Sequence, residues 1–381
     1  MTPTAITAVE GALNQADAAI NNGATDEEVG KSLGDLEKAA DKWIKPYPNP
    51  EWRENIEVFL VAIVVAMGVR TFFLQPFKIP TGSMQPTLWG ITVQDWHDKP
   101  ELKFPGFFGK IWDIAVHGET FHEVIAPEDC RFVGLNPPDH PAHPIPFINK
   151  QDIIVQYADG RQQALPVWGS PDDDPHHEQW RETGLFDRLV FHKGEPIVRY
   201  VEITGDHLFV DRFTYNFRHP ERGEIIVFKT RGIPGIPDQN QFYIKRLVGL
   251  PGETISIGTN RHASVNGKEL DASTPRFEEV YGFNPDIPPR RSEYSGHVLL
   301  SVMSPGYFGY LNGPNDSYTV KPGHYLVFGD NTMNSLDSRF WGDLPNTNVI
   351  GKSFFVYWPF STLSPDGTHY TSRFGWAHTI K

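Results

Sequence analysis

Three polar stretches, far apart in the chain, carry residue types that could perform nucleophilic chemistry. The first, FKIPTGSMQPTL, places Ser83 directly after a glycine, shortly beyond the only long apolar run. A Gly-Ser pair is most often just a turn. The stretch is not a Gly-x-Ser-x-Gly elbow either, because Thr81 and Gln85 stand at the flanking positions. Taken alone, Ser83 is therefore a weak candidate nucleophile.

The second stretch, FYIKRLVGL, contains two adjacent cations within a β-rich pattern. A strand here would place Tyr243 and Lys245 on one face and Ile244 and Arg246 on the other. We therefore expect one of the two cations to face the interior. A lysine at a strand edge usually extends its ammonium to water. A buried lysine would instead have a lowered pKa and could accept a proton near neutral pH.

The third stretch, GDNTMNSLDSRFWG, spans residues 329–342 and follows a strand-like run. A solvated turn is the usual interpretation of such a polar loop. However, it ends in Phe-Trp and places Asp337 two residues before Arg339. This combination favours a structured polar network over a mobile surface loop.

The composition narrows the classes of protein and partner. The 381 residues carry a formal net charge of -13, which argues against nucleic-acid binding because phosphate contacts need clustered Lys and Arg. Cys130 is the single cysteine, so no intramolecular disulfide can form, and we expect it to be a small buried side chain. Neighbouring prolines keep His140 and His143 from aligning as helical ligands. With His176 and His177 they are interpreted as solvated loop residues, and we predict neither a metal site nor a cofactor.

The N-terminal part predicts helices. Residues 1–50 have the pattern of two short amphipathic helices, the second starting at Asp26. Residues 55–75 form an apolar run with charges only near its ends, which predicts one transmembrane helix. A buried core helix is the alternative. A cleaved secretory signal is not expected, because the run begins far from the N-terminus, and the flanking charges do not decide the orientation.

The rest of the chain predicts a mainly β fold. Short runs such as GEIIVFKT and HYLVFGD are bounded by Gly, Pro and Asp, and Asn266-Gly267 predicts a tight hairpin. We assign residues 76–94 and 202–360 to one β-rich domain. Residues 95–201 are Pro-, His- and Asp-rich, and only DIIVQYADG has a clear strand pattern; we interpret them as an insertion of unknown role. Residues 361–381 are interpreted as a C-terminal tail.

The polar stretches, taken in order behind one apolar run, resemble the bacterial type I signal peptidases (leader peptidases). Four motifs carry the resemblance: SMQPTL from Ser83, RGEIIVF from Arg222, KRLVGLPGE from Lys245 and GDNTMNSLDSR from Gly329. The family has an arginine where Thr332 stands and an aspartate where Glu253 stands. The resemblance implies a membrane-anchored, β-rich catalytic domain of signal-peptidase type, with one N-terminal transmembrane helix behind a short helical region.

The resemblance also implies roles for individual residues. The hydroxyl of Ser83 would attack the scissile carbonyl, and the neutral amine of Lys245 would accept its proton. The Ser83 backbone N–H and the Thr81 hydroxyl would hold the oxyanion. Support for the pair would come from Asp330, Ser335, Asp337 and Arg339, with Ser335 orienting the lysine. The substrate pocket would be lined by Phe77, Ile79, Pro80, Met84, Leu88, Tyr243 and Ile244.

The implied function is removal of signal peptides from exported preproteins after Ala-x-Ala sites. The resemblance places the protein in the bacterial cytoplasmic membrane as a single-pass protein, with residues 1–54 cytoplasmic and residues 76–381 on the exported side. Its partners would be preproteins, the lipid bilayer and the export machinery. Two alternatives stay open. One is another Ser-Lys peptidase, such as the self-cleaving repressors. The other is a weakly active or inactive relative that binds preproteins or acts as a scaffold.

Overall fold

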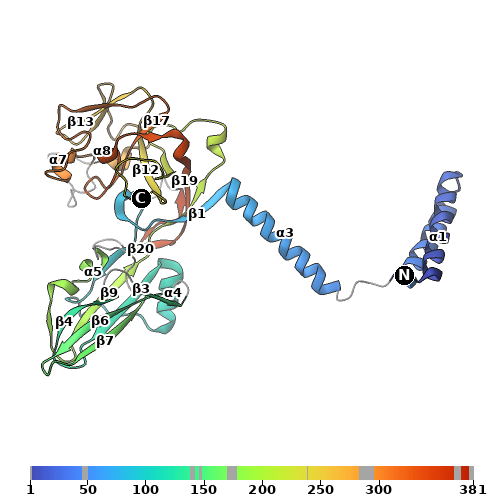
Figure 1. The fold of residues 1–381 in the computed structure, drawn as a ribbon, viewed down its shortest axis with the longest axis horizontal. Helices are drawn as coiled ribbons and strands as arrows, with labels where there is room; N and C mark the ends of the chain where they lie inside the picture. The colour runs from blue at the N-terminus through green and yellow to red at the C-terminus, as the bar shows by residue number, and fades with distance from the viewer. Residues whose placement is uncertain are drawn as a thin grey trace. The chain divides into compact units, whose positions relative to one another are not determined.

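The structure is a computed structural model. It describes residues 2–44, 50–137, 142–145, 148–169, 178–237, 239–282, 296–363 and 370–376. The chain divides into two compact units, residues 1–68 and residues 69–381, and Figure 1 shows the elements of each.

The first unit begins with two helices that pack against each other, α1 (Pro3–Asn21) and α2 (Asp26–Trp43). The carboxylate of Glu28 accepts a hydrogen bond from the Thr25 backbone N–H at 3.1 Å. This bond satisfies one of the free N–H groups where the helix begins. The predicted start of the second helix at Asp26 is therefore confirmed.

The third helix, α3 (Pro50–Phe72), carries the apolar run. Its segment Trp52–Phe72 has 21 residues and a mean hydropathy of 1.8, and none of its apolar window is buried. It is the one helix in the described part of the chain that is long and apolar enough to cross a membrane. The exposed window contradicts the alternative of a buried core helix. The helix ends at Phe72 and a strand begins at Leu74, so the predicted end at residue 75 was too late.

The second unit contains an eight-stranded antiparallel sheet that begins directly after α3. Its strands run in the order β1 (Leu74–Lys78), β10 (His207–Asp211), β19 (Val349–Trp358), β11 (Ile225–Lys229), β12 (Phe242–Gly249), β17 (His324–Phe328) and β18 (Leu344–Pro345), with β22 (Gly375–Trp376) paired to β19. The strands predicted from GEIIVFKT, FYIKRLVGL and HYLVFGD are β11, β12 and β17, and these predictions are confirmed.

A four-stranded sheet packs beside the first and shares its apolar core. Its order is β15 (Lys268–Glu269), β14 (Ala263–Val265), β13 (Thr254–Ile257) and β16 (Ser317–Thr319). Asn266 and Gly267 join β14 to β15 with φ of 51° and 81°, the left-handed backbone that an Asn-Gly hairpin turn requires. The predicted hairpin is therefore confirmed.

Residues 92–203 form a lobe with its own core, which we call the inserted lobe. One sheet has the order β2 (Thr92–Asp95), β9 (Pro196–Ile203), β3 (Glu119–Ile125). The other has the order β5 (Ala142–Ile145), β6 (Ile148–Tyr157), β4 (Cys130–Asn136), β8 (Val190–Phe191), with β7 (Gln162–Trp168) paired to β6. Two helices, α4 (Phe107–His117) and α5 (Glu178–Glu182), complete it.

The inserted lobe is more regular than its sequence indicated. The strand predicted from DIIVQYADG is β6, and Cys130 is buried as expected. The neighbouring strands were missed because buried and exposed positions do not alternate strictly along them; β9, for example, buries two adjacent pairs of residues. Their apolar side chains become a core only when the lobe's sheets pack together.

The remaining elements are short. Within the predicted tail, residues 361–363 pair with residues 370–372, and residues 375–376 pair with β19 of the main sheet. These three short segments form strands because their backbone groups bond to β19 and to each other. The short elements are β20 (Ser361–Leu363), β21 (Tyr370–Ser372), α6 (Glu278–Tyr281), α7 (Leu300–Met303), α8 (Ser338–Trp341), and the 3-10 helices Gly82–Met84, Leu185–Asp187, Thr214–Asn216 and Asn346–Asn348.

Candidate active site

Ser83 lies in a single turn of 3-10 helix, η1 (Gly82–Met84), between β1 and the inserted lobe. Asn331 holds this turn from the other side: its backbone N–H donates to the Ser83 carbonyl at 3.1 Å and its side-chain amide to the Gly82 carbonyl at 3.0 Å. A Cβ at Gly329 would lie 2.5 Å from the Ser83 carbonyl oxygen. Only glycine at this position therefore lets the 329–342 loop approach the serine so closely.

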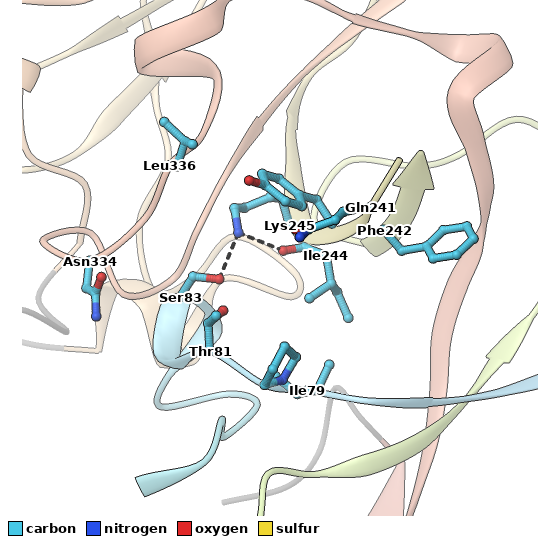
Figure 2. Close-up of a pocket in the computed structure, with 11 residues that line it drawn as sticks. Ile79, Thr81, Ser83, Gln241, Phe242, Ile244, Lys245, Asn334 and Leu336 are labelled. Carbon is cyan, nitrogen blue, oxygen red and sulfur yellow. Dashed lines mark hydrogen bonds between the residues drawn. The ribbon is translucent and has the colours of Figure 1, made fainter. Parts of the chain in front are cut away.

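Lys245 reaches Ser83 from β12. Its Nζ donates to the Ser83 Oγ at 2.7 Å and to the Ile244 carbonyl at 3.0 Å, as Figure 2 shows. Lys245 is only 4% exposed and Arg246 only 3%. We expected only one of these two cations to face the interior. Both are buried, because β12 is covered on both faces at this point. The two residues lie 162 positions apart in sequence, so the tertiary fold alone brings them together.

The environment of Lys245 favours its neutral form. Burial lowers the pKa of Lys245 to about 8, and the positive charge of Arg339 acts in the same direction. The carboxylates of Asp337 and Asp330 oppose this shift by favouring the ammonium. A substantial fraction of the amine is thus neutral at mildly alkaline pH, and a neutral amine 2.7 Å from a hydroxyl can accept its proton.

A buried ion pair connects the serine loop, β12 and the 329–342 loop. Arg246 donates to Asp330 through Nε at 2.7 Å and through Nη2 at 2.5 Å. Thr87, four residues beyond Ser83, donates its hydroxyl to the same carboxylate at 2.6 Å. Because Asn331 follows Asp330 directly, this bidentate pair also fixes the residue that holds the serine turn.

A second buried pair organises the 329–342 loop itself. Asp337 Oδ2 accepts from Arg339 at 2.7 Å, from Ser335 Oγ at 2.8 Å and from the Gly329 N–H at 3.0 Å. Burial alone would raise the pKa of Asp337, but the Arg339 charge and these hydrogen bonds hold it below its usual value. The polar network expected for this loop is present. Within the described residues Ser335 makes no hydrogen bond to Lys245, so the implied direct contact is absent and the Ile244 carbonyl orients the amine instead.

The two residues that depart from the family pattern, Glu253 and Thr332, both form hydrogen bonds. Glu253 forms a bidentate pair with Arg222, at 2.9 and 2.5 Å. Thr332 is fully buried, and its hydroxyl accepts from the Val298 N–H at 2.7 Å and from Arg339 at 2.9 Å. An arginine at position 332 would place a second cation against Arg339, whereas threonine supplies an acceptor.

A pocket of about 240 Å³ opens beside the serine and the lysine. It is lined by Ile79, Pro80, Thr81, Ser83, Gln241, Phe242, Tyr243, Ile244, Lys245, Asn334 and Leu336. Four of the seven predicted pocket residues are among them: Ile79, Pro80, Tyr243 and Ile244.

The other three predicted pocket residues lie elsewhere. Met84 and Leu88 are fully buried in the apolar core between β1, β10 and β11. Phe77 packs against that core and meets the Phe242 ring edge-on at 5.3 Å. Gln241, Phe242, Asn334 and Leu336 were missed as lining residues. The first two directly precede Tyr243 and the others flank Ser335, so proximity to the motifs was the available signal.

Thr81 occupies the N-cap position of η1, but its hydroxyl makes no capping hydrogen bond. Its side chain lines the pocket next to Ser83 (Figure 2). Gly90 permits this arrangement, because a Cβ there would come within 2.7 Å of the Gly82 backbone nitrogen. The Thr81 hydroxyl is therefore available to a group bound in the pocket.

In the part of the chain that the structure describes, no group of three His, Cys, Asp or Glu side chains is placed to hold a metal ion. The side chains of the histidines at positions 140, 143, 176 and 177 lie outside the described residues. The prediction about them stays untested.

The fold and the site define a class: a mainly β protein with a buried lysine hydrogen-bonded to a loop serine in a partly apolar pocket. The family described as "Signal peptidase, peptidase S26" matches residues 52–97 and 201–358, more than half of the chain. The chain belongs to this family. The match omits residues 1–51, residues 98–200, which form most of the inserted lobe, and everything after Trp358.

Two relatives agree with this assignment in sequence. The chain is 33% identical over 190 residues to a signal peptidase I of Pseudomonas aeruginosa, covering 42% of this chain and 62% of the relative. It is 32% identical over 165 residues to a signal peptidase I of Leptolyngbya laminosa, covering 43% and 65%. The chain thus spans less than two thirds of the length of these relatives. A crystal structure of a signal peptidase I from Enterococcus faecalis V583 aligns at 25% identity and a TM-score of 0.24, covering 35% of this chain and 97% of that one.

Proposed function

We propose that this protein is a membrane-anchored serine endopeptidase that removes N-terminal signal peptides from exported preproteins. The observation that carries the proposal is the 2.7 Å hydrogen bond between the Lys245 amine and the Ser83 hydroxyl, with both groups buried. A serine hydroxyl is a weak nucleophile unless an adjacent base removes its proton. Lys245 meets this requirement because burial lowers its pKa to about 8.

The proposed reaction has two halves. In the first, the neutral amine of Lys245 takes the proton of Ser83 while Oγ attacks the scissile carbonyl, and the Thr81 hydroxyl and the Ser83 N–H stabilise the oxyanion. The ammonium then protonates the leaving amine of the mature protein, which leaves an ester on Ser83. In the second half, Lys245 takes a proton from water, and the resulting hydroxide attacks the ester carbonyl. The bond from that carbonyl carbon to Ser83 Oγ breaks, the Lys245 ammonium returns its proton to Oγ, and the signal peptide leaves with a free carboxylate.

The substrate is proposed to bind as an extended strand. Among the described strands, β1 is the terminal strand of its sheet and pairs with β10 alone, so a peptide can be accommodated at its other edge. In the described part of the chain, the ladder from β12 to β17 begins at Arg246, the residue after Lys245. A peptide could therefore add to these edges next to Ser83. The small, partly apolar pocket suits Ala-sized side chains, consistent with Ala-x-Ala sites.

The proposed location is the bacterial cytoplasmic membrane, crossed once by the Trp52–Phe72 segment. Residues 1–54 would face the cytoplasm and the catalytic unit the exported side. The support is the length and exposure of α3 and the short distance along the chain from Phe72 to Ser83. Labelling of single cysteines placed at positions 38 and 229 with an impermeant reagent would test this orientation in intact spheroplasts.

Cleavage by the full chain in detergent tests the enzymatic proposal. The substrate is a preprotein with an Ala-x-Ala site, and the variants are Ser83→Ala and Lys245→Met. We expect both to lose about 10³-fold or more of the rate, as removal of a nucleophile or base does elsewhere. Lys229→Met, an exposed lysine on the neighbouring strand β11, should cleave normally. If the unaltered chain binds the preprotein but leaves it whole, the protein is a binding relative and not a peptidase.

A further inference from the structure

Helix α4 of the inserted lobe turns an apolar face outward. It contributes no fully buried residue to the unit, although its sequence FFGKIWDIAVH is mostly apolar. Five large side chains on it are between 46% and 84% exposed: Phe107, Phe108, Ile111, Trp112 and Ile114. The helix lies outside the stretches that the family description matches, so it is a feature of this chain's own insertion.

The polar residues of α4 point the other way. Lys110 is half-buried, with its Nζ 5.7 Å from the Phe104 ring. His117 is also half-buried; it hydrogen-bonds Ser361 at 2.9 Å and its ring lies 4.0 Å from Tyr370. Asp113 is half-buried as well. A helix on a water-exposed surface has the opposite arrangement, so the outer face of α4 is built to be covered by something apolar.

The helix is firmly attached to the rest of the unit. The Trp358 indole donates to the Ala115 carbonyl at 2.9 Å, and the Phe360 N–H donates to the Val116 carbonyl at 2.9 Å. Gly118 ends the helix in the left-handed conformation, with φ of 66°. These bonds connect α4 to β19 and β20, so its exposed face belongs to an ordered surface; Figure 1 shows α4 beside β3.

The apolar surface continues beyond α4. Phe360, Phe374 and Trp376 are each 46–49% exposed. The rings of Phe360 and Phe374 lie 5.4 Å apart, and Trp376 meets Phe355 of β19 at 5.5 Å. β22, which carries Trp376, pairs with β19; β19 pairs with β10, and β10 with β1. The strand β1 begins two residues after the apolar segment of α3 ends. The sheet that includes β22 therefore follows directly in the chain after the proposed membrane anchor.

We propose that α4 lies in the interface of the lipid bilayer, with its Phe, Ile and Trp side chains in the boundary between headgroups and acyl chains. This second membrane contact rests on the proposed anchoring by α3. Tethering by α3 would keep the surface close to lipid at high effective concentration. Exposed Trp and Phe side chains are typical of helices that bind at this depth. The outer face carries no Lys, Arg, Asp or Glu and the chain has a net charge of -13, so the contact is apolar and insensitive to salt.

The test measures lipid contact at one position of the full chain, reconstituted at one chain per nanodisc. In a Cys130→Ala background, Phe108→Cys carries an environment-sensitive nitrobenzoxadiazole label, and the nanodisc contains lipids with shallow spin labels. The matched control is Val190→Cys, a 65% exposed apolar residue on β8 of the same lobe. We expect blue-shifted emission and about twofold or greater quenching at position 108, unchanged in high salt, and neither effect at position 190.

The outcomes separate the two proposals. Loss of the chain from the nanodiscs would contradict the anchoring by α3. Two results with a chain that stays in the nanodisc would overturn the α4 proposal. In the first, the label at position 108 emits as it does in water. In the second, the label is shielded from water but is not quenched by the lipid spin labels, which would indicate a protein partner. As a further check, Trp112→Asp in the labelled Phe108→Cys chain should abolish the quenching at position 108. Val133→Asp, an exposed position on β4, should not change it.

Discussion

The family-matching core and the inserted lobe use charged side chains in different ways. Around the serine and the lysine, the ion pairs Arg246–Asp330 and Arg339–Asp337 are almost completely buried, and so is the pair that Asp206 forms with Arg373, an arginine beyond the family match. In the inserted lobe the core is apolar, and the ion pairs range from partly exposed, as in Lys150–Asp152, to more than half exposed, as in Arg161–Asp159. Both regions belong to the same compact unit. The difference in ion-pair burial therefore reflects which side chains and loops each region has to hold in place.

This difference has a physical meaning. A buried ion pair contributes little net stability relative to an apolar pair, but it tolerates only one arrangement of its partners. Arg246 and Asp330 join β12 to the loop that holds Ser83 in place, and Arg373 joins residues beyond the family match to Asp206 and to the Thr87 carbonyl. The catalytic region thus uses buried charge to fix loops relative to one another. The lobe relies mainly on its apolar core, although Arg199 also holds the segment 96–102 through three backbone carbonyls.

The largest predicted effect is on the buried pair itself. Asp330→Asn leaves the Arg246 charge without its counterion, and removing one partner of a buried pair costs about 3–5 kcal/mol. Urea unfolding of the purified chain measures this loss. The same change at the exposed pair of the lobe, Asp159→Asn, should leave the unfolding midpoint unaltered. Equal effects at the two positions would contradict the contrast between the regions.

The oxyanion proposal predicts a loss of rate without a loss of stability. Thr81→Val removes a pocket hydroxyl that has no capping role, and deleting one such donor lowers kcat by about 10²–10³-fold. Thr81→Ser keeps the hydroxyl and should retain most of the activity. The measurements are kcat on a preprotein and the midpoint of thermal unfolding. A normal kcat in the Thr81→Val chain would contradict the proposed role of the Thr81 hydroxyl in holding the oxyanion.

The pH dependence of cleavage should follow Lys245. The active form is the neutral amine, and burial lowers the pKa of Lys245 to about 8. Because the amine is protonated below that pKa, kcat/KM should fall about tenfold per pH unit as the pH decreases below 8 and reach a plateau above it. A pH–rate profile checks this. A value of kcat/KM that stays constant between about pH 6 and about pH 9 would contradict a lysine general base.

The smallest predicted effect is on stability and follows from removing one methylene from the apolar core of the lobe. Ile153→Val removes one methylene from a fully buried position of β6, which typically costs about 0.5–1.5 kcal/mol. The cleavage rate should stay normal, because the pocket contains no residue of the lobe. Denaturant unfolding and the preprotein assay on the same sample measure both quantities. A change in rate larger than the change in stability would show that the two regions are coupled.

The sequence by itself determined the local elements. The apolar run of α3, the strands of the motifs and the Asn266-Gly267 hairpin follow from periodicity and turn chemistry within a few neighbouring residues. The resemblance to the family depended on the same kind of local information, since each motif is a short contiguous stretch.

Tertiary structure decided everything that depends on residues far apart in the chain. It joined Lys245 to Ser83 across 162 positions, placed Met84 and Leu88 in the core instead of the pocket, and directed Ser335 to Asp337. It also gave the lobe strands that its sequence does not mark and turned the apolar face of α4 outward. The physical reason is that burial, and with it the lowered pKa of Lys245, arises from packing between elements and not from any one of them.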